Sequence, residues 1–156
     1  MDLDSDQVAL ALPLPWQGQL WQRFNQRLEQ GRLPHGVMLS GPPGIGVERL
    51  ATAFSQRLLC NAEMSKYACG SCKGCKLLMA GTHPDLSILE PADVGKGILI
   101  DSVRNLTARL GKTAQQGGWK VALISPAEAM NESSCNALLK SLEEPQSKTL
   151  LILVSH

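Results

Sequence analysis

Four short apolar runs, separated by longer segments with helical periodicity, limit the folds open to this chain more than any other feature. The runs are residues 37–39, 86–89, 121–124 and 150–154. Each run is continuous rather than alternating, which is typical of strands buried on both faces of a parallel sheet. Strands that alternate with helices in this way indicate an α/β fold, with helices covering both faces of a parallel sheet.

The segments around these runs supply the helices. The predicted helical segments are residues 13–33 (after an initial loop), 47–59, 102–116 and 132–144. Apolar side chains recur at helical spacing in the first of them, at Leu20, Trp21, Phe24 and Leu28. The third has Val103, Leu106 and Leu110 on one face. In the fourth, which stops at Pro145, we expect Leu138, Leu139 and Leu142 to face the sheet.

Composition fits a single folded domain. The chain has 156 residues, of which 44% are hydrophobic and 19% charged, and its formal net charge is +1. This balance argues against disorder and gives no overall basic field for nucleic acid. No apolar run reaches the roughly 18 residues of a membrane span, and the acidic N-terminus is unlike a signal peptide. We therefore expect a cytoplasmic protein without a membrane partner, whose five cysteines are thiols or metal ligands.

A glycine-rich turn joins the first strand to the helix over residues 47–59, which is the setting of a phosphate-binding loop. The pattern of such loops is G-x-x-x-x-G-K-[ST], and Gly41 and Gly46 occupy its two glycine positions. The full candidate loop comprises Gly41, Pro42, Pro43, Gly44, Ile45, Gly46, Val47 and Glu48. Val47 stands where the lysine should be, and Glu48 stands where a hydroxyl should hold Mg²⁺.

These two replacements remove the groups that phosphoryl transfer needs. Valine supplies no positive charge to the β- and γ-phosphates, and Glu48 brings negative charge toward them. We therefore expect no ATP cofactor and no ATP hydrolysis, and we interpret the turn as one kept for packing. Its backbone N–H groups and helix terminus leave open weak binding of a small anion.

The second acidic site of an ATPase is missing as well. A strand of the Walker B type should end in an aspartate that holds Mg²⁺, but the strand over 121–124 ends in Ser125. Glu128, three residues farther on, is too distant in sequence to be assigned that role. Two degenerate motifs at the expected separation favour an ATPase fold that has lost its chemistry.

Four cysteines within sixteen residues predict a metal site. Cys60, Cys69, Cys72 and Cys75 follow the pattern C-x₈-C-x₂-C-x₂-C. Four thiolates with short C-x₂-C steps favour a structural zinc ion, with no open position for catalysis. An iron–sulfur cluster or disulfides are the alternatives. We expect three of the ligands to come from a loop or short turn, and Cys135 to be a separate packing residue.

Several of these motifs together resemble the clamp-loader branch of the AAA+ superfamily. The segments that carry the resemblance are Leu33-Pro34-His35, the Gly41–Gly46 turn, the four cysteines, residues 81–85 (GTHPD) and residues 136–145 (NALLKSLEEP). The resemblance covers about residues 13–156. The motor subunits of the family, gamma and tau, keep the lysine and the acidic residues that Val47 and Ser125 replace. The chain is therefore closer to the subunits of the family that have no ATPase residues.

This resemblance implies a fold and a role. The fold is a P-loop, AAA+-type sheet of strand order 5-1-4-3-2, of which residues 1–156 hold strands one to four and a zinc insertion at 60–75. The resemblance implies that a fifth strand, a lid domain, a collar domain and a Ser-Arg-Cys arginine would follow residue 156. Because the fifth strand would pair with the first, the first strand is expected to be an edge within residues 1–156. The role is a non-catalytic stator in DNA replication. Its partners are gamma/tau and delta subunits and, through the complex, the sliding clamp and primed DNA. Any DNA polymerase or nucleotidyltransferase label would come from membership of the DNA polymerase III complex.

Without a working active site, function should depend on surfaces that meet neighbouring subunits. We expect Lys140, Glu143 and Glu144 to form such a surface, close to the phosphate loop. Two alternatives remain: an ATP-binding motor subunit, and a zinc-dependent nucleic-acid-binding module that uses Lys66, Lys73 and Lys76. Arg104, Arg109 and Lys112 are interpreted as a solvated helix face.

Overall fold

The strands form one parallel sheet, as predicted. The computed structural model describes residues 9–62, 65–93, 95–143 and 145–156. Its strands are β1 (Gly36–Ser40), β2 (Leu86–Leu89), β3 (Lys120–Ile124) and β4 (Thr149–Ser155). They pair in the order β1-β4-β3-β2, and all three pairings are parallel. β1 is an edge of this sheet, and its Met38 side chain is 61% exposed.

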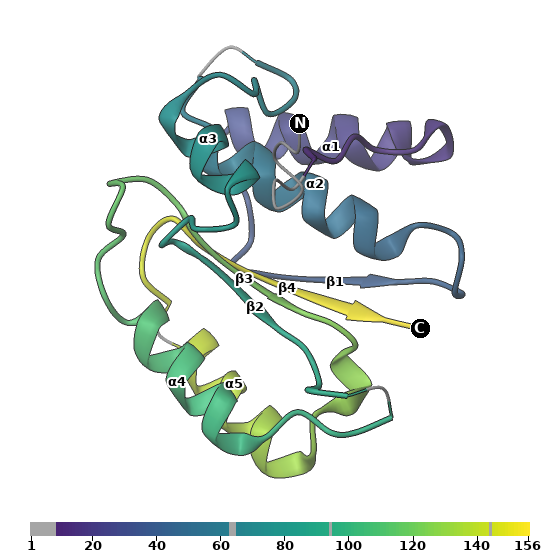
Figure 1. Cartoon of the computed structure of the whole chain (residues 1–156), viewed down its shortest axis with the longest axis vertical. Helices are drawn as coiled ribbons and strands as arrows, with labels where there is room; N and C mark the ends of the chain where they lie inside the picture. Colours follow the sequence, from purple (N-terminus) through teal and green to yellow (C-terminus); the bar gives the residue numbers. More distant parts are fainter. Residues whose placement is uncertain (1–8, 63–64, 94, 144) are drawn as a thin grey trace, which may run out of the picture.

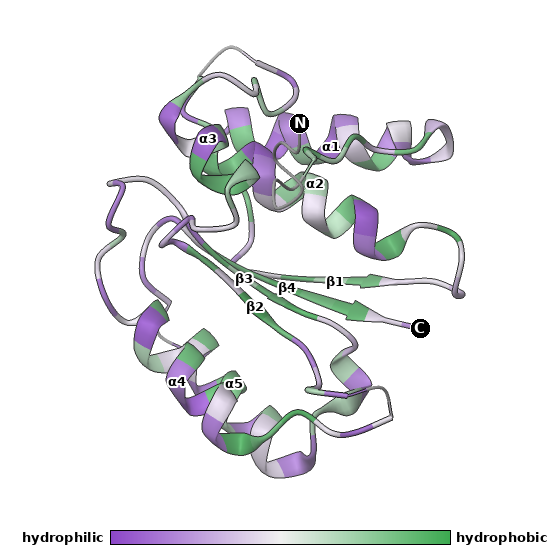
Figure 2. Ribbon diagram, viewed as in Figure 1, coloured by the Kyte–Doolittle hydropathy of each residue, from purple (hydrophilic) through white to green (hydrophobic). Residues whose placement is uncertain are grey.

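Helices cover both faces of the sheet (Figure 1). The helices α1 (Gly18–Glu29), α2 (Val47–Leu59) and α3 (Lys73–Met79) lie on one face, and α4 (Ile100–Leu110) and α5 (Glu132–Glu143) lie on the other. Successive residues of β3 point to opposite faces, so Val121 packs with the first layer and Ala122 with the second. Figure 2 shows the apolar strands between the two layers. None of the helices in these ranges is long and apolar enough to cross a membrane.

Helix bounds agree with the sequence at α2 and, over the described residues, at α5, whereas α1 ends at Glu29 instead of reaching Leu33, and α3 and α4 also differ. The predicted helix 47–59 is α2, but the helix predicted over 102–116 ends at Leu110. Asp85 accepts hydrogen bonds from the backbone N–H groups of Gln115 (2.7 Å) and Gln116 (2.9 Å), which holds residues 111–119 as a loop. α3 was not expected; the Sγ of Cys72 accepts from the N–H of Cys75 and caps its first turn.

The expectation that Leu139 faces the sheet is wrong. Leu138 is 2% exposed and Leu142 is partly buried, whereas Leu139 is 56% exposed. Residues four apart share a helix face, but the next residue is rotated by about 100°. The apolar stripe of α5 is therefore narrower than the sequence suggests.

Candidate metal centre and modified phosphate loop

The turn between β1 and α2 has the backbone of a phosphate loop. The N–H of Gly41 donates to the carbonyl of Ser155 in β4 at 3.2 Å. Gly44 (φ 89°) and Gly46 (φ 92°) are both in the left-handed region that favours glycine. A Cβ at Gly46 would lie 2.4 Å from the Cδ1 of Leu14, so packing also excludes a side chain there. Both the conformation and the neighbouring segment thus require the second glycine.

The N-terminal segment is tied to the carbonyls of this loop. Trp16 Nε1 donates to the carbonyl of Ile45 at 3.0 Å, and Gln17 Nε2 donates to the carbonyl of Gly46 at 2.9 Å. Arg49 Nε, from the first turn of α2, donates to the carbonyl of Leu12 at 2.7 Å. These bonds fix the loop from outside without any ligand.

Val47 and Glu48 are placed for structural contacts. The Val47 side chain is 6% exposed and belongs to the core between α2 and the sheet. Glu48 is exposed, and its Oε1 lies 2.5 Å from Nε2 of His156, the residue that follows β4. Nδ1 of His156 lies 3.3 Å from the carbonyl oxygen of Gly41, so both ring nitrogens face acceptors. The bond to Glu48 is the main cause that raises the pKa of His156, which favours an imidazolium beside the loop.

Glu128 reaches this cluster from the short 3-10 helix Ala127–Ala129. Ser125 follows β3, and its peptide bond to Pro126 is cis. Glu128 accepts hydrogen bonds from the Ser155 hydroxyl and from the His156 N–H, the latter at 3.2 Å. The Ser155 hydroxyl is the main cause that lowers the Glu128 pKa. Two carboxylates, Glu48 and Glu128, therefore lie at the end of β4 with one histidine between them.

Sequence reasoning missed Ser155 and His156 and set Glu128 aside. A signal was available, because carboxyl ends of neighbouring parallel strands meet at one edge of a sheet. In the order β1-β4-β3, the residues after β4 must lie between the loop and Ser125. The resulting cluster holds two carboxylates and one histidine beside the glycine turn.

A pH titration tests the contact between Glu48 and His156. We expect His156 to titrate above its ordinary pKa, and Glu48→Gln to bring that pKa back down. Because folding raises this pKa, the stabilising contribution is complete below the unfolded pKa and is lost as pH rises through the folded one. NMR of the His156 ring resonances against pH measures the folded pKa of His156 in the parent and in the variant. Glu132→Gln, at the start of α5, is the matched control; equal shifts in both variants would contradict the contact.

The four predicted cysteines come together at the opposite end of the sheet from the phosphate loop (Figure 1). The Sγ atoms of Cys60, Cys69, Cys72 and Cys75 all lie within 4.8 Å of one another. Two of the pairs, Cys69–Cys75 and Cys72–Cys60, are 3.9 Å apart. A disulfide requires about 2.05 Å, whereas a tetrahedron with Zn–S bonds of about 2.3 Å has edges of about 3.8 Å. These separations fit a tetrahedral metal site, and all five cysteines are free thiols.

Local backbone geometry prepares the sulfurs for a metal. Cys60 ends α2, Cys72 caps α3 and Cys75 lies in its first turn. Backbone N–H groups approach the sulfurs at 3.3–3.5 Å: those of Asn61, Ala62, Cys69, Ser71, Cys72 and Cys75. The N–H of Ser71, and then that of Cys72, lower the Cys69 pKa to about 6. Burial has the opposite effect on two of the other thiols: it raises the pKa of Cys60, and it raises the pKa of Cys75 to about 12, so a metal would have to displace protons from these sulfurs.

Close packing joins this module to the core. A Cβ at Gly74 would lie 2.2 Å from the carbonyl oxygen of Leu59, so α3 reaches the end of α2 only with glycine there. Leu78 of α3 is buried in the main core, and the Tyr67 ring stacks on Trp21 at 5.5 Å. Cys135 lies on α5 and is not part of the cluster.

The residues proposed as a partner surface are exposed but lie away from the phosphate loop. Lys140 and Glu143 are exposed on α5, and Glu144 lies outside the described residues. The side chain of Leu142 lies 3.7 Å from a Cβ built at Gly36, the first residue of β1. The loop follows the other end of β1, so the expected proximity is wrong. α5 runs back toward the amino ends of the strands, which carries its last turn away.

Comparisons with known proteins identify the family. Residues 16–156 match the family described as DNA polymerase III, delta subunit. This chain belongs to that family. A relative from Pseudomonas aeruginosa named DNA polymerase III subunit delta′ is 49% identical over 142 residues. Relatives of the same name from Escherichia coli and Bacillus subtilis are 37% identical over 142 residues and 32% identical over 128 residues. The predicted family is confirmed.

The match covers most of this chain but less than half of each delta′ relative. Coverage is 91% of the chain and 42% of the relative for Pseudomonas aeruginosa, 90% and 42% for Escherichia coli, and 82% and 38% for Bacillus subtilis. Among solved structures, a DNA polymerase III gamma subunit-related protein from Thermotoga maritima superposes with a TM-score of 0.52 at 16% identity. The superposition covers 89% of this chain and 38% of the Thermotoga maritima protein, and it supports the fold.

Proposed function

We propose that the chain is the N-terminal part of a non-catalytic delta′ subunit, a stator that helps load the sliding clamp onto primed DNA without hydrolysing ATP. The observation that carries the proposal is the state of the phosphate loop: Val47 is buried in the core, and Glu48 is joined to His156. The proposed partners are gamma/tau motor subunits and the delta subunit, in the cytoplasm. Relatives named subunit delta′ support this assignment.

The same proposal assigns structural zinc to Cys60, Cys69, Cys72 and Cys75, one ion per chain. Four thiolates satisfy the tetrahedral preference of zinc and leave no position for a substrate. The module would hold the end of α2 to α3 and so stabilise one face of the sheet.

In the full-length protein, we propose that a fifth strand pairs with β1, followed by lid and collar domains. The order β1-β4-β3-β2 leaves only β1 and β2 as edges, and Met38 gives β1 an exposed apolar side chain. Unpaired apolar edges favour pairing with another strand.

Isothermal titration with MgATP tests the loss of ATP binding. We expect no binding with a dissociation constant near or below 1 µM, a threshold that corresponds to about −8 kcal/mol. The reason is that the loop lacks a cation and places Glu48 and Glu128 near the phosphates. A motor subunit of the clamp loader, titrated in the same buffer, is the positive control. Micromolar affinity for this chain would contradict the proposal.

Charge reversal at Lys140 tests the partner surface. We expect Lys140→Glu in the full-length protein to weaken capture of motor and delta subunits at least about threefold, without a change in melting temperature. An exposed charge contributes little to folding, typically within about 0.5 kcal/mol, but like charges across an interface reduce binding. Glu132→Lys, at the start of the same helix, controls for a general effect of charge. Unchanged assembly would show that Lys140 is an ordinary surface residue.

A further inference from the structure

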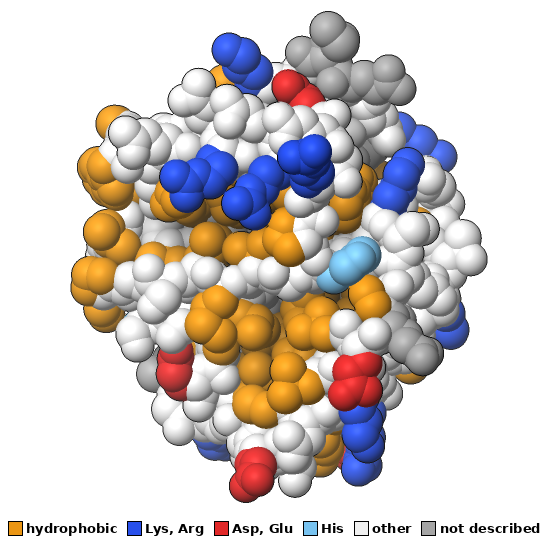
Figure 3. All heavy atoms as spheres, turned by 180° about the vertical axis from the view of Figure 1, so that it is seen from behind, with side chains coloured by type: hydrophobic (Ala, Val, Ile, Leu, Met, Phe, Trp, Pro, Cys, Tyr) orange, Lys and Arg blue, Asp and Glu red, His pale blue; other side chains and the backbone are white. Residues whose placement is uncertain are grey.

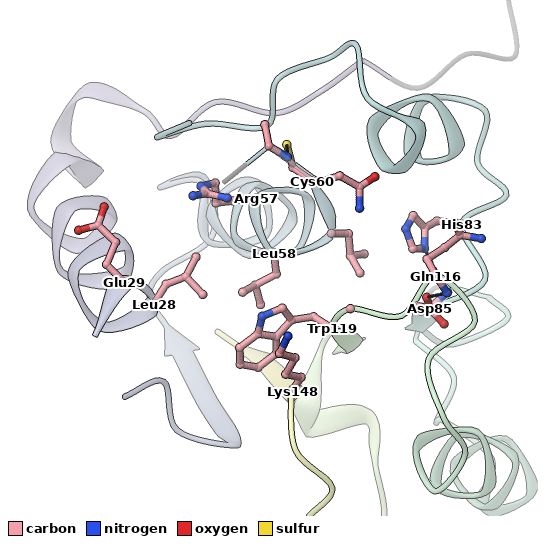
Figure 4. A pocket seen from close by; sticks show the side chains of 14 residues that line it. Leu28, Glu29, Arg57, Leu58, Cys60, His83, Asp85, Gln116, Trp119 and Lys148 are labelled. Carbon is pink, nitrogen blue, oxygen red and sulfur yellow. Dashed lines mark hydrogen bonds between the residues drawn. The ribbon is translucent and has the colours of Figure 1, made fainter. Parts of the chain in front are cut away.

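A cavity of about 370 Å³ opens at the amino ends of the strands, and Figure 4 shows the side chains that line it. Its wall combines the end of α1, the end of α2 with the first residues of the cysteine module, and the segments that lead into β2, β3 and β4. This volume lies within the roughly 300–1,000 Å³ of typical small-molecule sites. Cys60 of the candidate metal centre lies on this wall, but Cys69, Cys72 and Cys75 and the residues of the glycine turn do not.

Asn61, His83 and Asp85, on the cavity wall, already accept hydrogen bonds from backbone N–H groups of the protein. Asn61 Oδ1 accepts from the N–H of Gly74 at 2.8 Å, which leaves its amide NH₂. His83 Nδ1 accepts from the N–H of Asp85 at 3.1 Å, so in the neutral ring the proton is on Nε2. Both carboxylate oxygens of Asp85 already accept from the loop that follows α4. The free side-chain groups of Asn61 and His83 are therefore donors, which suits a ligand that accepts hydrogen bonds.

Cationic groups line the same cavity. Trp119 and Lys148 directly precede the paired residues Lys120 and Thr149, and both line the cavity, where Figure 4 draws their side chains in the same part of the wall. Lys148 has φ 53°, a left-handed conformation that is uncommon outside glycine. Arg57 is 7% exposed, and its Nε has no hydrogen-bond partner. Glu29 is an exposed acid on the wall, and in Figure 4 its carboxylate points away from Trp119.

Apolar groups complete the cavity. Leu28 of α1 and Leu58 of α2 face the indole ring of Trp119 across it (Figure 4). We propose that this cavity binds a small organic oxyanion: its phosphate or carboxylate group contacts Lys148 and Trp119 Nε1, and its flat apolar part packs between Leu28, Leu58 and the indole ring. This site is independent of the nucleotide chemistry and of the stator role proposed above.

NMR titration of the purified chain tests this site with four probes. Phenyl phosphate and benzoate carry both features, inorganic phosphate carries the anion alone, and benzyl alcohol carries the ring alone. We expect phenyl phosphate or benzoate to shift the Trp119 Nε1–H resonance. That probe should bind at least about tenfold more tightly than inorganic phosphate or benzyl alcohol, because its two contacts act together. The preferred probe identifies the oxyanion. The proposal would be overturned if neither phenyl phosphate nor benzoate shifted this resonance at about 10 mM. It would also be overturned if inorganic phosphate or benzyl alcohol bound as tightly as the preferred probe.

Lys148→Gly removes the cation while favouring the native backbone, so the fold should be retained. It should weaken the preferred probe about tenfold, the usual effect of losing a charge-assisted hydrogen bond. Trp119→Phe keeps a ring but loses the N–H and with it the reporting resonance, so its affinity is measured from the backbone amide shifts of the cavity residues, and it should weaken binding less. Arg104→Gln, an exposed cation on α4, is the matched control and should leave binding unchanged. A Lys148→Gly variant that melts normally and binds as the parent does would reject the site.

Discussion

Changing Cys72 to serine is expected to release the metal and lower the melting temperature by roughly 10 °C, equivalent to about 3 kcal/mol for a domain of this size. Cys72 Sγ is both a candidate ligand and the cap of α3, and it accepts from the N–H groups of Asn61 and Cys75. Metal content by mass spectrometry should fall from about one zinc per chain to nearly none. Removal of zinc from the parent by a chelator should lower the melting temperature to a similar extent.

Cys135→Ser is the matched control for this experiment. Cys135 lies on α5 away from the four clustered sulfurs, so the variant should keep its zinc. A Cys72→Ser protein that retains stoichiometric zinc would show that the ligand set is wrong. A parent whose melting temperature is unchanged by the chelator would show that the metal does not stabilise the fold.

The parallel sheet could be predicted because its signals are local and redundant. The central strands β3 and β4 contain continuous apolar runs, and α2 extends from Val47 to Leu59, where the sequence placed those limits. The clustering of the four cysteines could also be predicted, since their short spacing in the sequence limits how far apart they can lie. The wrong end of α4 depended on contacts distant in sequence. The early end of α4 reflects Asp85, some thirty residues upstream, which binds Gln115 and Gln116.

The phosphate loop also combines features that local sequence predicts with contacts that it does not predict. The absence of a lysine and of a hydroxyl could be inferred from Val47 and Glu48 alone. That His156 contacts Glu48, and that Glu128 reaches β4, depends on which strands are neighbours and on how the chain turns after each. An acidic side chain three residues beyond a strand has no fixed direction in sequence. Tertiary structure gives it one.

Restoring the missing lysine with Val47→Lys is expected to destabilise the chain by about 3 kcal/mol and not to create MgATP binding. Val47 is 6% exposed and packs in the main core with neighbours that include Leu50 and Ala51. A lysine there either buries an unpaired charge or displaces the loop, since Val47 Cγ2 lies 3.0 Å from a Cβ built at Gly41. Urea unfolding at pH 7 measures the loss, and isothermal titration measures the nucleotide.

Two variants separate the possible causes of that loss. Val47→Ala removes packing without adding charge and should cost less, roughly 1–2 kcal/mol. Ile45→Lys places the same charge two residues earlier, where the side chain is 41% exposed, and should cost no more than about 1 kcal/mol. If Val47→Lys unfolded like the parent and bound MgATP, a single substitution would be all that silences this loop. The expected result is a loop whose lysine position has become part of the core, so that recovery of ATP binding would require several coupled changes.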